Sequence, residues 1–411
     1  MTADGEVRAV VTGVGVAAPN GTGTEAYWAA TLAGRSGIAP TTRYDASGYP
    51  LRLAGEVRDF EPGKHIPSRL LPQTDHATRL SLYAADEALR DSALDPDRLA
   101  PYGMGVATAS SMGGFEFGQR ELQNLWSKGG RFVSAYQSFA WFYAVNTGQI
   151  SIRHGLRGSS NTVVTDAAGG LDALGNARRQ IRKGTTAMLS GGVDGALCPL
   201  GLAGHLSSGA MSGGSRPDRA FLPFAEDASG QVPGEGGAFL VLEDMASARR
   251  RGARSYGELA GYAATFDAAP QASGQAGAGL VRAIRRALDD ARTAPGDVDV
   301  VFADAAGVPE LDRAESRALG EVFGPGGVPV TAPKSMTGRL CAGGASLDLV
   351  TALLALRDGA IPPTVNVSRP GPGHPIDLVT REPREADLRR ALVVARGRGG
   401  FNAAAVVRRD A

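Results

Sequence analysis

The sequence is poor in the side chains from which metal and redox sites are built. Its two cysteines, Cys198 and Cys341, stand among small and apolar residues, which predicts two free thiols in a reducing compartment rather than a disulfide framework. The histidines share no HExxH or Cys/His spacing, so we expect no metal and no cofactor. The five histidines are His65, His76, His154, His205 and His374.

Long apolar runs and an excess of one charge are also missing. No apolar run approaches the roughly 18 residues of a membrane span, and the N-terminal stretch MTADGEVRAVVTG does not combine a basic patch with an apolar core. Lys and Arg number 43 against 42 Asp and Glu, and no basic stripe alternates with aromatic residues. We therefore expect a cytoplasmic protein that binds neither a membrane nor nucleic acid.

Two common catalytic signatures are absent as well. The Gly-rich stretch GVGVAAPNGTG lacks the three-glycine dinucleotide fingerprint and its downstream acid. No GxSxG hydrolase elbow occurs either. Generic motifs therefore leave the function open.

The sequence does contain short β-branched runs that alternate with helical patterns, which is typical of α/β architecture. Its 411 residues, 43% of them hydrophobic, suffice for a large buried core. The strand-like runs are residues 7–14, 162–166, 187–191 and 239–242.

Helix and strand patterns of the first half recur in the second. The recurrence predicts a duplicated fold with halves 1–250 and 251–411, packed as one body because no Pro-, Ser- or charge-rich linker separates them. The matching segments are 80–91 and 103–109 with 280–291 and 298–303, and 170–182 and 187–191 with 345–357 and the strand-like 364–367.

Five segments, spanning nearly the whole chain in order, resemble the β-ketoacyl synthases of the thiolase superfamily. The resemblance implies the thiolase fold, with two pseudo-repeated halves in a five-layer α/β/α/β/α arrangement. The segments are VVTGVGVAAPNGTGTEAYWAATLAGRSGI (10–38), TDAAGGLDAL (165–174), RAFLPFAEDASGQVPGEGGAFLVLED (219–244), PKSMTGRLCAGGASLD (333–348) and RGRGGFNAAAVV (396–407).

An active ketosynthase of this family carries its acyl chain on a cysteine at a helix N-terminus and uses two histidines for decarboxylation and oxyanion stabilisation. Matched motif by motif, the cysteine position is Ala167, and the histidine positions are Asp304 and Arg339. The family's lysine and acid are matched by Lys334 and Glu315. The resemblance implies a retained scaffold without its nucleophile, because an alanine methyl group cannot be acylated.

Loss of all three groups within intact motifs is typical of the chain length factors of bacterial type II aromatic polyketide synthases. FEFGQRELQNLWSKG and QSFAWFYAVNTGQISIRHGLRG also resemble that subgroup. The resemblance implies a non-catalytic subunit that pairs with a catalytic ketosynthase alpha subunit, works with an acyl carrier protein and sets poly-β-keto chain length. Alternatives are a malonyl-carrier decarboxylase or priming factor, and a purely structural stabiliser. Many chain length factors have glutamine where this chain has Ala167, which speaks against priming.

Phe115, Gly118, Leu122 and Leu125 recur at helical spacing, which on its own predicts an ordinary core stripe. The resemblance instead implies that the first three line a tunnel and limit the growing chain, and we favour this gate. Gly118 and Leu122 are smaller than the Thr or Phe of family members that make shorter chains. We therefore expect a decaketide or longer product.

An aromatic block follows the gate in the sequence. By default such residues belong to the core, but the resemblance implies that this segment packs across the heterodimer interface, where aromatic side chains are enriched. The block consists of Phe139, Trp141, Phe142 and Tyr143.

Asp304 and Arg339 are expected to form a buried ion pair that plugs the former active site. An isolated buried charge costs several kcal/mol, whereas opposite charges with good hydrogen-bond geometry offset much of that cost. The planar fork of Arg339 suits a bidentate contact with the carboxylate.

Overall fold

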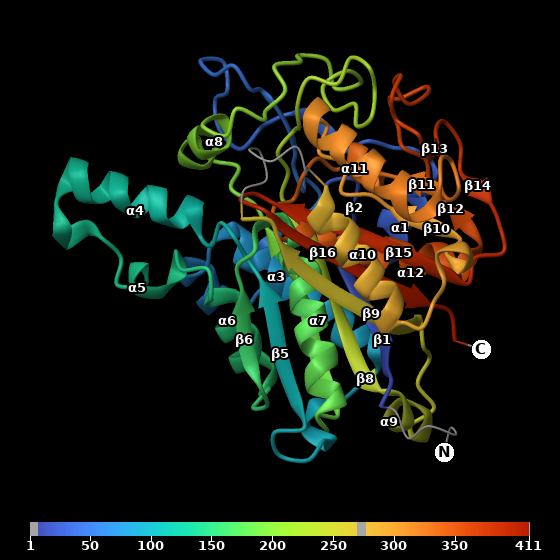
Figure 1. The fold of residues 1–411 in the computed structure, drawn as a ribbon. Helices are drawn as coiled ribbons and strands as arrows, with labels where there is room; N and C mark the ends of the chain where they lie inside the picture. Colours follow the sequence, from blue (N-terminus) through green and yellow to red (C-terminus); the bar gives the residue numbers. More distant parts are fainter. Residues whose placement is uncertain (1–6, 269–276, 411) are drawn as a thin grey trace.

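The computed structural model describes residues 7–268 and 277–410, and two groups of strands form its central sheet (Figure 1). In sheet order, the first group is β6 (Ser160–Val163), β5 (Met104–Ala109), β7 (Ala187–Asp194), β8 (Gly236–Asp244) and β1 (Ala9–Ala18), with β2 (Gly21–Thr22) paired to β1. The second group is β9 (Gly257–Phe266), β16 (Phe401–Arg408), β15 (Arg390–Gly397), β10 (Val300–Phe302), β11 (Pro329–Thr331) and β13 (Asp377–Leu378).

The two groups of strands touch at one point and then separate. β1 pairs with β9 at Val10↔Glu258 and Val11↔Gly257, after which β1 continues beside β8 and β9 beside β16. The separation leaves a wedge between the groups, and two helices lie in it. These helices are α7 (Gly169–Arg182) and α12 (Gly343–Asp358).

Helices complete the predicted α/β/α/β/α layers. Side chains of α7 and α12 share one buried core with residues of β1 and β8 on one side and of β15 and β16 on the other. A second core lies beneath α3 and α6 on the outer face of the first group, and a third beneath α10 and α11 on the second. The outer helices are α3 (His76–Ser92), α6 (Val145–His154), α10 (Ala278–Asp290) and α11 (Pro309–Phe323).

Shorter elements connect these layers. The short helices are α1 (Thr24–Leu32), α2 (Pro62–His65), α8 (Pro199–Leu206) and α9 (Met245–Arg250). The short strands are β3 (Ile38–Pro40), β4 (Leu53–Gly55), β12 (Ala360–Ile361) and β14 (Arg384–Glu385). None of the helices in 7–268 and 277–410 has the length and apolar character that crossing a bilayer requires.

The strand expected at residues 364–367 is not formed, so this prediction is wrong. Within this segment, Thr364 makes a single bridge to Thr380. Pro362 and Pro363 directly before this segment have no backbone N–H to donate to a ladder.

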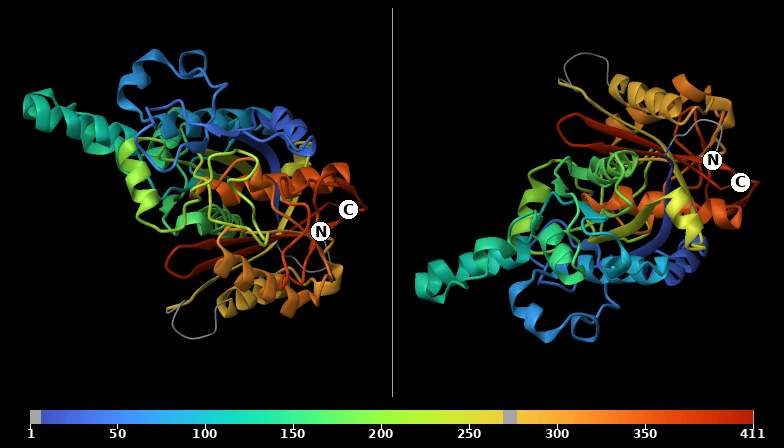
Figure 2. Two further views of the ribbon diagram at one scale, coloured as in Figure 1. Left: turned by 90° about the horizontal axis from the view of Figure 1, so that it is seen from above. Right: turned by 90° about the horizontal axis from the view of Figure 1, so that it is seen from below.

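A projecting arm, residues 115–143, contains α4 (Phe115–Lys128) and α5 (Gln137–Ala140) and extends from the layered body in all three views (Figures 1 and 2). The Asp75 carboxylate anchors its root by accepting from Phe117 N over 2.8 Å. Glu121 joins the two limbs by accepting from Ser134 N over 2.7 Å. The arm exposes a series of large apolar side chains that this chain leaves uncovered: Leu125, Trp126, Phe132, Tyr136, Trp141, Phe142 and Tyr143.

The α7–α12 contact depends on Gly170, where a Cβ would lie 2.6 Å from Ser346 N and 2.5 Å from its Oγ. We expect Gly170→Val to lower the free energy of unfolding by at least 1–3 kcal/mol, roughly the cost of overpacking a tight core. Urea unfolding followed by circular dichroism measures it. Gly148→Ala is the control, because a Cβ there meets nothing within 4 Å. Equal effects of the two changes would contradict the close contact.

Candidate functional site

Ala167 lies in the 3-10 turn η4 (Asp166–Ala168), directly before α7. Asp166 has a φ of 52°, in the left-handed region that residues other than glycine rarely adopt. The turn places Ala167 at a helix N-terminus, where backbone amides stabilise negative charge and lower the pKa of a thiol. The position suits a nucleophile, but the methyl group present has no proton to lose.

Ala167 borders a small cavity between η4, the start of α12 and the loop before it. The cavity has a volume of about 10 Å³, which is room for about one water molecule. The structure thus brings together four of the five residues predicted for this site, and it adds a thiol that sequence reasoning had not placed there. The lining includes Ala167, Asp304, Lys334, Arg339 and Cys341.

Asp304 and Arg339 form the predicted buried ion pair. Arg339 Nη2 donates to Asp304 Oδ1 over 3.0 Å, and the side chains of Arg339 and Asp304 are 13% and 5% exposed. The expected bidentate contact with the carboxylate is wrong, because Nη1 donates to the backbone oxygen of Asp304 over 2.7 Å instead. The guanidinium therefore grips both the side chain and the main chain of one residue.

Both members of the pair are held in their charged forms. Burial raises the pKa of Asp304, but Arg339 and Lys334 together outweigh burial and lower that pKa below its ordinary value. Burial lowers the pKa of the Arg339 guanidinium, and Asp304 more than compensates and raises it. A fixed ion pair cannot take and return protons near neutral pH as an imidazole does.

Lys334 and Glu315 support the pair from opposite sides. Lys334 Nζ lies 2.7 Å from Asp348 Oδ2 at the cavity wall. Glu315 does not line the cavity, and its carboxylate accepts from the backbone N–H of Asp304 over 2.7 Å and of the next residue over 2.9 Å. Burial is the main reason why the pKa of Glu315 rises to about 7. Glu315 thus fixes the backbone that carries Asp304.

The tip of the β15–β16 hairpin is fastened to the same site. Arg396 N donates to Asp304 Oδ1 over 3.0 Å, and Arg398 N donates to Asp166 Oδ2 over 2.7 Å. The hairpin is therefore tied near its tip to the ion pair, through Arg396, and to the turn that contains Ala167, through Arg398. Sequence reasoning recognised this Gly-rich turn but missed its contacts, because backbone donors have no sequence signature.

Asp194, at the end of β7, links the site to the arm. Its carboxylate accepts from Ser111 N over 2.6 Å and Met112 N over 3.3 Å, which precede α4, and lies 3.4 Å from Ala342 N, at the start of α12. Burial raises the pKa of Asp194 to about 6 despite these amide donors. Sequence reasoning missed Asp194, since a single carboxylate after a strand belongs to no recognisable motif.

The predicted gate residues lie on the arm and are not among those lining the cavity. Gly118 is buried, whereas Phe115 and Leu122 are half-buried. Leu125 is exposed, so the alternative of an ordinary core stripe is wrong within this chain.

The aromatic block also lies on the arm, at its C-terminal end. Phe139 is half-buried, and Trp141, Phe142 and Tyr143 are exposed. The default expectation that such residues join the core is therefore wrong for these three.

Comparison with known proteins identifies the family. The sequence matches the family model of the beta-ketoacyl synthase N-terminal domain over residues 7–248 and that of the C-terminal domain over residues 256–368. It is 61% identical over 402 residues to the tetracenomycin polyketide synthase ketoacyl synthase beta subunit of Streptomyces glaucescens, covering 97% of this chain and 98% of the relative. It is also 61% identical to the actinorhodin polyketide putative beta-ketoacyl synthase 2 of Streptomyces coelicolor, covering 98% of each.

Solved structures share the fold over nearly the whole length. The ishigamide ketosynthase/chain length factor superposes with a TM-score of 0.90 at 33% identity, covering 99% of this chain and all of that one. A type II PKS ketosynthase, in complex with its acyl-carrier protein and bound to the hexaketide, superposes with a TM-score of 0.88 at 28% identity. That match covers 98% of this chain and all of the other.

The buried ion pair predicts strong coupling between its members. We expect Asp304→Leu or Arg339→Met alone to cost roughly 3–5 kcal/mol, because each leaves an uncompensated buried charge, and the double variant to cost less than the sum. Chemical unfolding of all four proteins measures the coupling. The exposed pair Arg216–Asp218 is the control, and its coupling should be far weaker because solvent screens exposed charges. A coupling near zero at the buried pair would show that the charges do not depend on each other.

Proposed function

The chain belongs to the beta-ketoacyl synthase family, and we propose that within it this protein is a non-catalytic chain length factor of a type II polyketide synthase. It pairs with a catalytic ketosynthase alpha subunit and sets the length of the poly-β-keto chain. The relatives that carry this proposal are the beta subunit from the tetracenomycin synthase and the ishigamide ketosynthase/chain length factor.

The observation that carries the proposal is the helix N-terminus at Ala167 beside the buried ion pair of Asp304 and Arg339. The resemblance to the family assigns these three positions to the catalytic cysteine and the two histidines. Decarboxylative condensation needs a thiolate to hold the acyl chain and neutral imidazoles to stabilise an oxyanion. Ala167 supplies no thiol, and burial raises the pKa of the Cys341 thiol well above its ordinary value, so that it stays protonated. The positions matched to the two histidines hold Asp304 and Arg339 instead of imidazoles. The same lack argues against independent decarboxylation or priming.

The surface on which the catalytic subunit docks is proposed to include the aromatic block, residues 139–143. These side chains present a continuous apolar area on the arm and its root, with Phe142 and Tyr143 in ring contact. β6, the end strand of the first group, has an unpaired edge, and Ile152 and Val164 near it are exposed. Exposed apolar side chains beside an open strand edge favour burial by another chain.

The chain to be measured arrives on an acyl carrier protein, as the hexaketide-bound ketosynthase complex illustrates for its own carrier. We propose that the polyketide extends from the partner's cysteine toward α4, where Phe115, Gly118 and Leu122 limit its length. Gly118 has no side chain and Leu122 is of moderate size, which supports a decaketide or longer product.

The division into halves 1–250 and 251–411 is also proposed. The first strand group comes from the chain before α9 and the second from the chain after it, which supports a boundary there. A cytoplasmic location is proposed as well, supported by two unpaired cysteines, Cys198 and Cys341.

The isolated subunit should not be acylated and should make no polyketide, because Ala167 offers no nucleophile. Intact-protein mass spectrometry after incubation with malonyl-loaded carrier protein tests this, with the reconstituted heterodimer as the positive control. Ala167→Cys should still not condense malonyl units, since the histidine positions remain Asp304 and Arg339. A stable acyl adduct on the native subunit would contradict the proposal.

Filling the gate should shorten the product. Gly118→Thr and Leu122→Phe each add bulk on one face of α4, so in the reconstituted synthase we expect products shorter by at least one two-carbon unit. Mass spectrometry of the released polyketides gives the length distribution. Unchanged lengths with reduced yield would favour a structural stabiliser.

A further inference from the structure

We infer that Trp141 is a further residue that sets product length, because its side chain forms the wall that Gly118 itself cannot provide. The inference rests on the proposed role of α4 as the gate. It assigns Trp141, predicted as an interface residue, to the space in which the growing chain is measured.

The root of α4 lies directly against the segment that carries Trp141. Gly114 N donates to Trp141 O over 3.0 Å. A Cβ at Gly114 would come within 1.9 Å of Ala140 O, and a Cβ at Gly113, whose φ is 64°, within 2.6 Å of Trp141 O. Two successive glycines thus allow main chain to meet main chain. The position of Trp141 is therefore fixed relative to the first turn of α4.

One turn further along α4, the same tryptophan faces the gate. A Cβ at Gly118 would lie 3.5 Å from Trp141 Cβ, at ordinary van der Waals distance. In the described part of the chain, the helix backbone and the two adjacent residues apart, no other heavy atom comes within 4 Å of that Cβ. Gly118 is nevertheless buried, so Trp141 is the side chain that borders it. At this position of the gate, the Trp141 side chain therefore takes the place of the side chain that Gly118 lacks.

The indole is not held as part of the core of this chain. Trp141 is 50% exposed, and its described ring neighbour is Phe142, with 6.0 Å between ring centroids. Leu122 follows Gly118 by four residues and shares its helix face. A large, half-exposed apolar ring beside Gly118, followed by Leu122, provides the apolar surface along which an acyl chain can lie.

This arrangement makes residues 118 and 141 interdependent. Bulk added at position 118 extends from a Cβ that is already at van der Waals distance from Trp141, so the two side chains compete for neighbouring space. Removal of the indole should open the gate at the same place. Bulk at 118 and bulk at 141 therefore act on one space, and their effects on product length should not add.

The test compares heterodimers of the catalytic subunit with variants of this chain, supplied with carrier protein and malonyl units. Trp141→Ala should shift the products longer by at least one two-carbon unit, with Trp141→Phe in between. The matched control is Trp126→Ala at the far end of α4, where the side chain is 77% exposed. It removes the same ring from the same arm, and product length should stay as in the native protein.

The double variant Gly118→Thr/Trp141→Ala separates a shared space from two independent effects. The Gly118→Thr change should shorten the product less in the Trp141→Ala background than in the native background. Size-exclusion chromatography confirms that each heterodimer forms, and if Trp141→Ala does not assemble, Trp141→Leu takes its place in both comparisons.

Native product length in the assembled Trp141 variants, while Leu122→Phe still shortens the chain, would overturn the assignment of Trp141 and leave the gate intact. Native length in the Leu122→Phe variant as well would show that the gate itself is wrong.

Discussion

A charge inside a protein needs a partner, and the centre of this molecule is organised by the contact between Asp304 and Arg339. The same carboxylate accepts from Arg396 N near the tip of the β15–β16 hairpin, and Glu315 of α11 holds the backbone that carries it. The loop before α12 supplies the guanidinium. Elements of the second strand group, an outer helix and the central helix layer thus meet at one pair of charges. On the proposed function, a former reaction centre serves as a structural junction.

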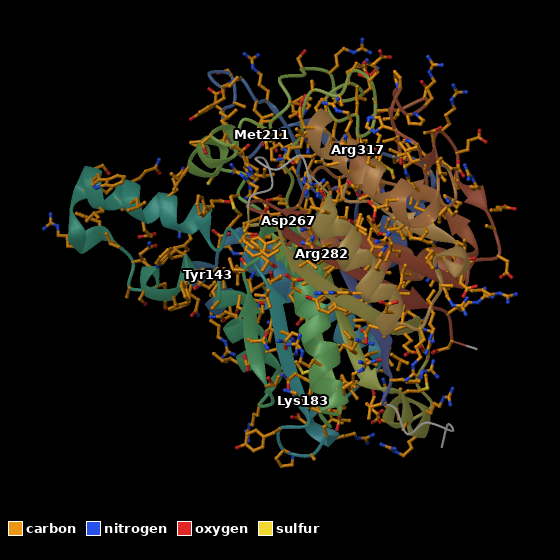
Figure 3. The ribbon with its side chains drawn as sticks, viewed as in Figure 1. Tyr143, Lys183, Met211, Asp267, Arg282 and Arg317 are labelled. Atoms are coloured by element: carbon orange, nitrogen blue, oxygen red, sulfur yellow. The ribbon has the colours of Figure 1, made fainter. Side chains whose placement is uncertain are left out.

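The layered body buries its apolar side chains, whereas the arm leaves many of its own exposed. Three buried cores fill the layers around α7 and α12, while residues 115–143 expose large apolar side chains on both limbs. Figure 3 shows the arm with its side chains and labels Tyr143 among them. Glycines at the root of α4 and the Asp75 carboxylate hold the arm firmly without covering it. A rigid support with an uncovered apolar surface is what a permanent partner requires.

Much of the fold and of the site followed from the sequence, and the remainder had no sequence signal. Buried strands and motif order predicted the layers, and the cost of burying single charges predicted the ion pair. The predicted bidentate contact of Arg339 with the carboxylate was wrong, because a backbone oxygen accepts from one of its two N–H groups instead. The contacts of Asp194 and Arg398 involve main-chain amides, which are identical at every residue. Trp141 approaches Gly118 only because the chain folds back on itself, and no residue spacing in the sequence indicates the contact.

On the proposed function, the Asp304–Arg339 pair also makes a return of the family's chemistry difficult for this chain. A lineage that regained one histidine would first pass through a protein with a single unpaired buried charge. Its free energy of unfolding would be lower by roughly 3–5 kcal/mol, a large share of the total stability of a typical domain. A new cysteine at position 167 would bring no benefit on that route. On the proposed function, this loss of stability is a barrier that keeps the subunit dependent on its catalytic partner.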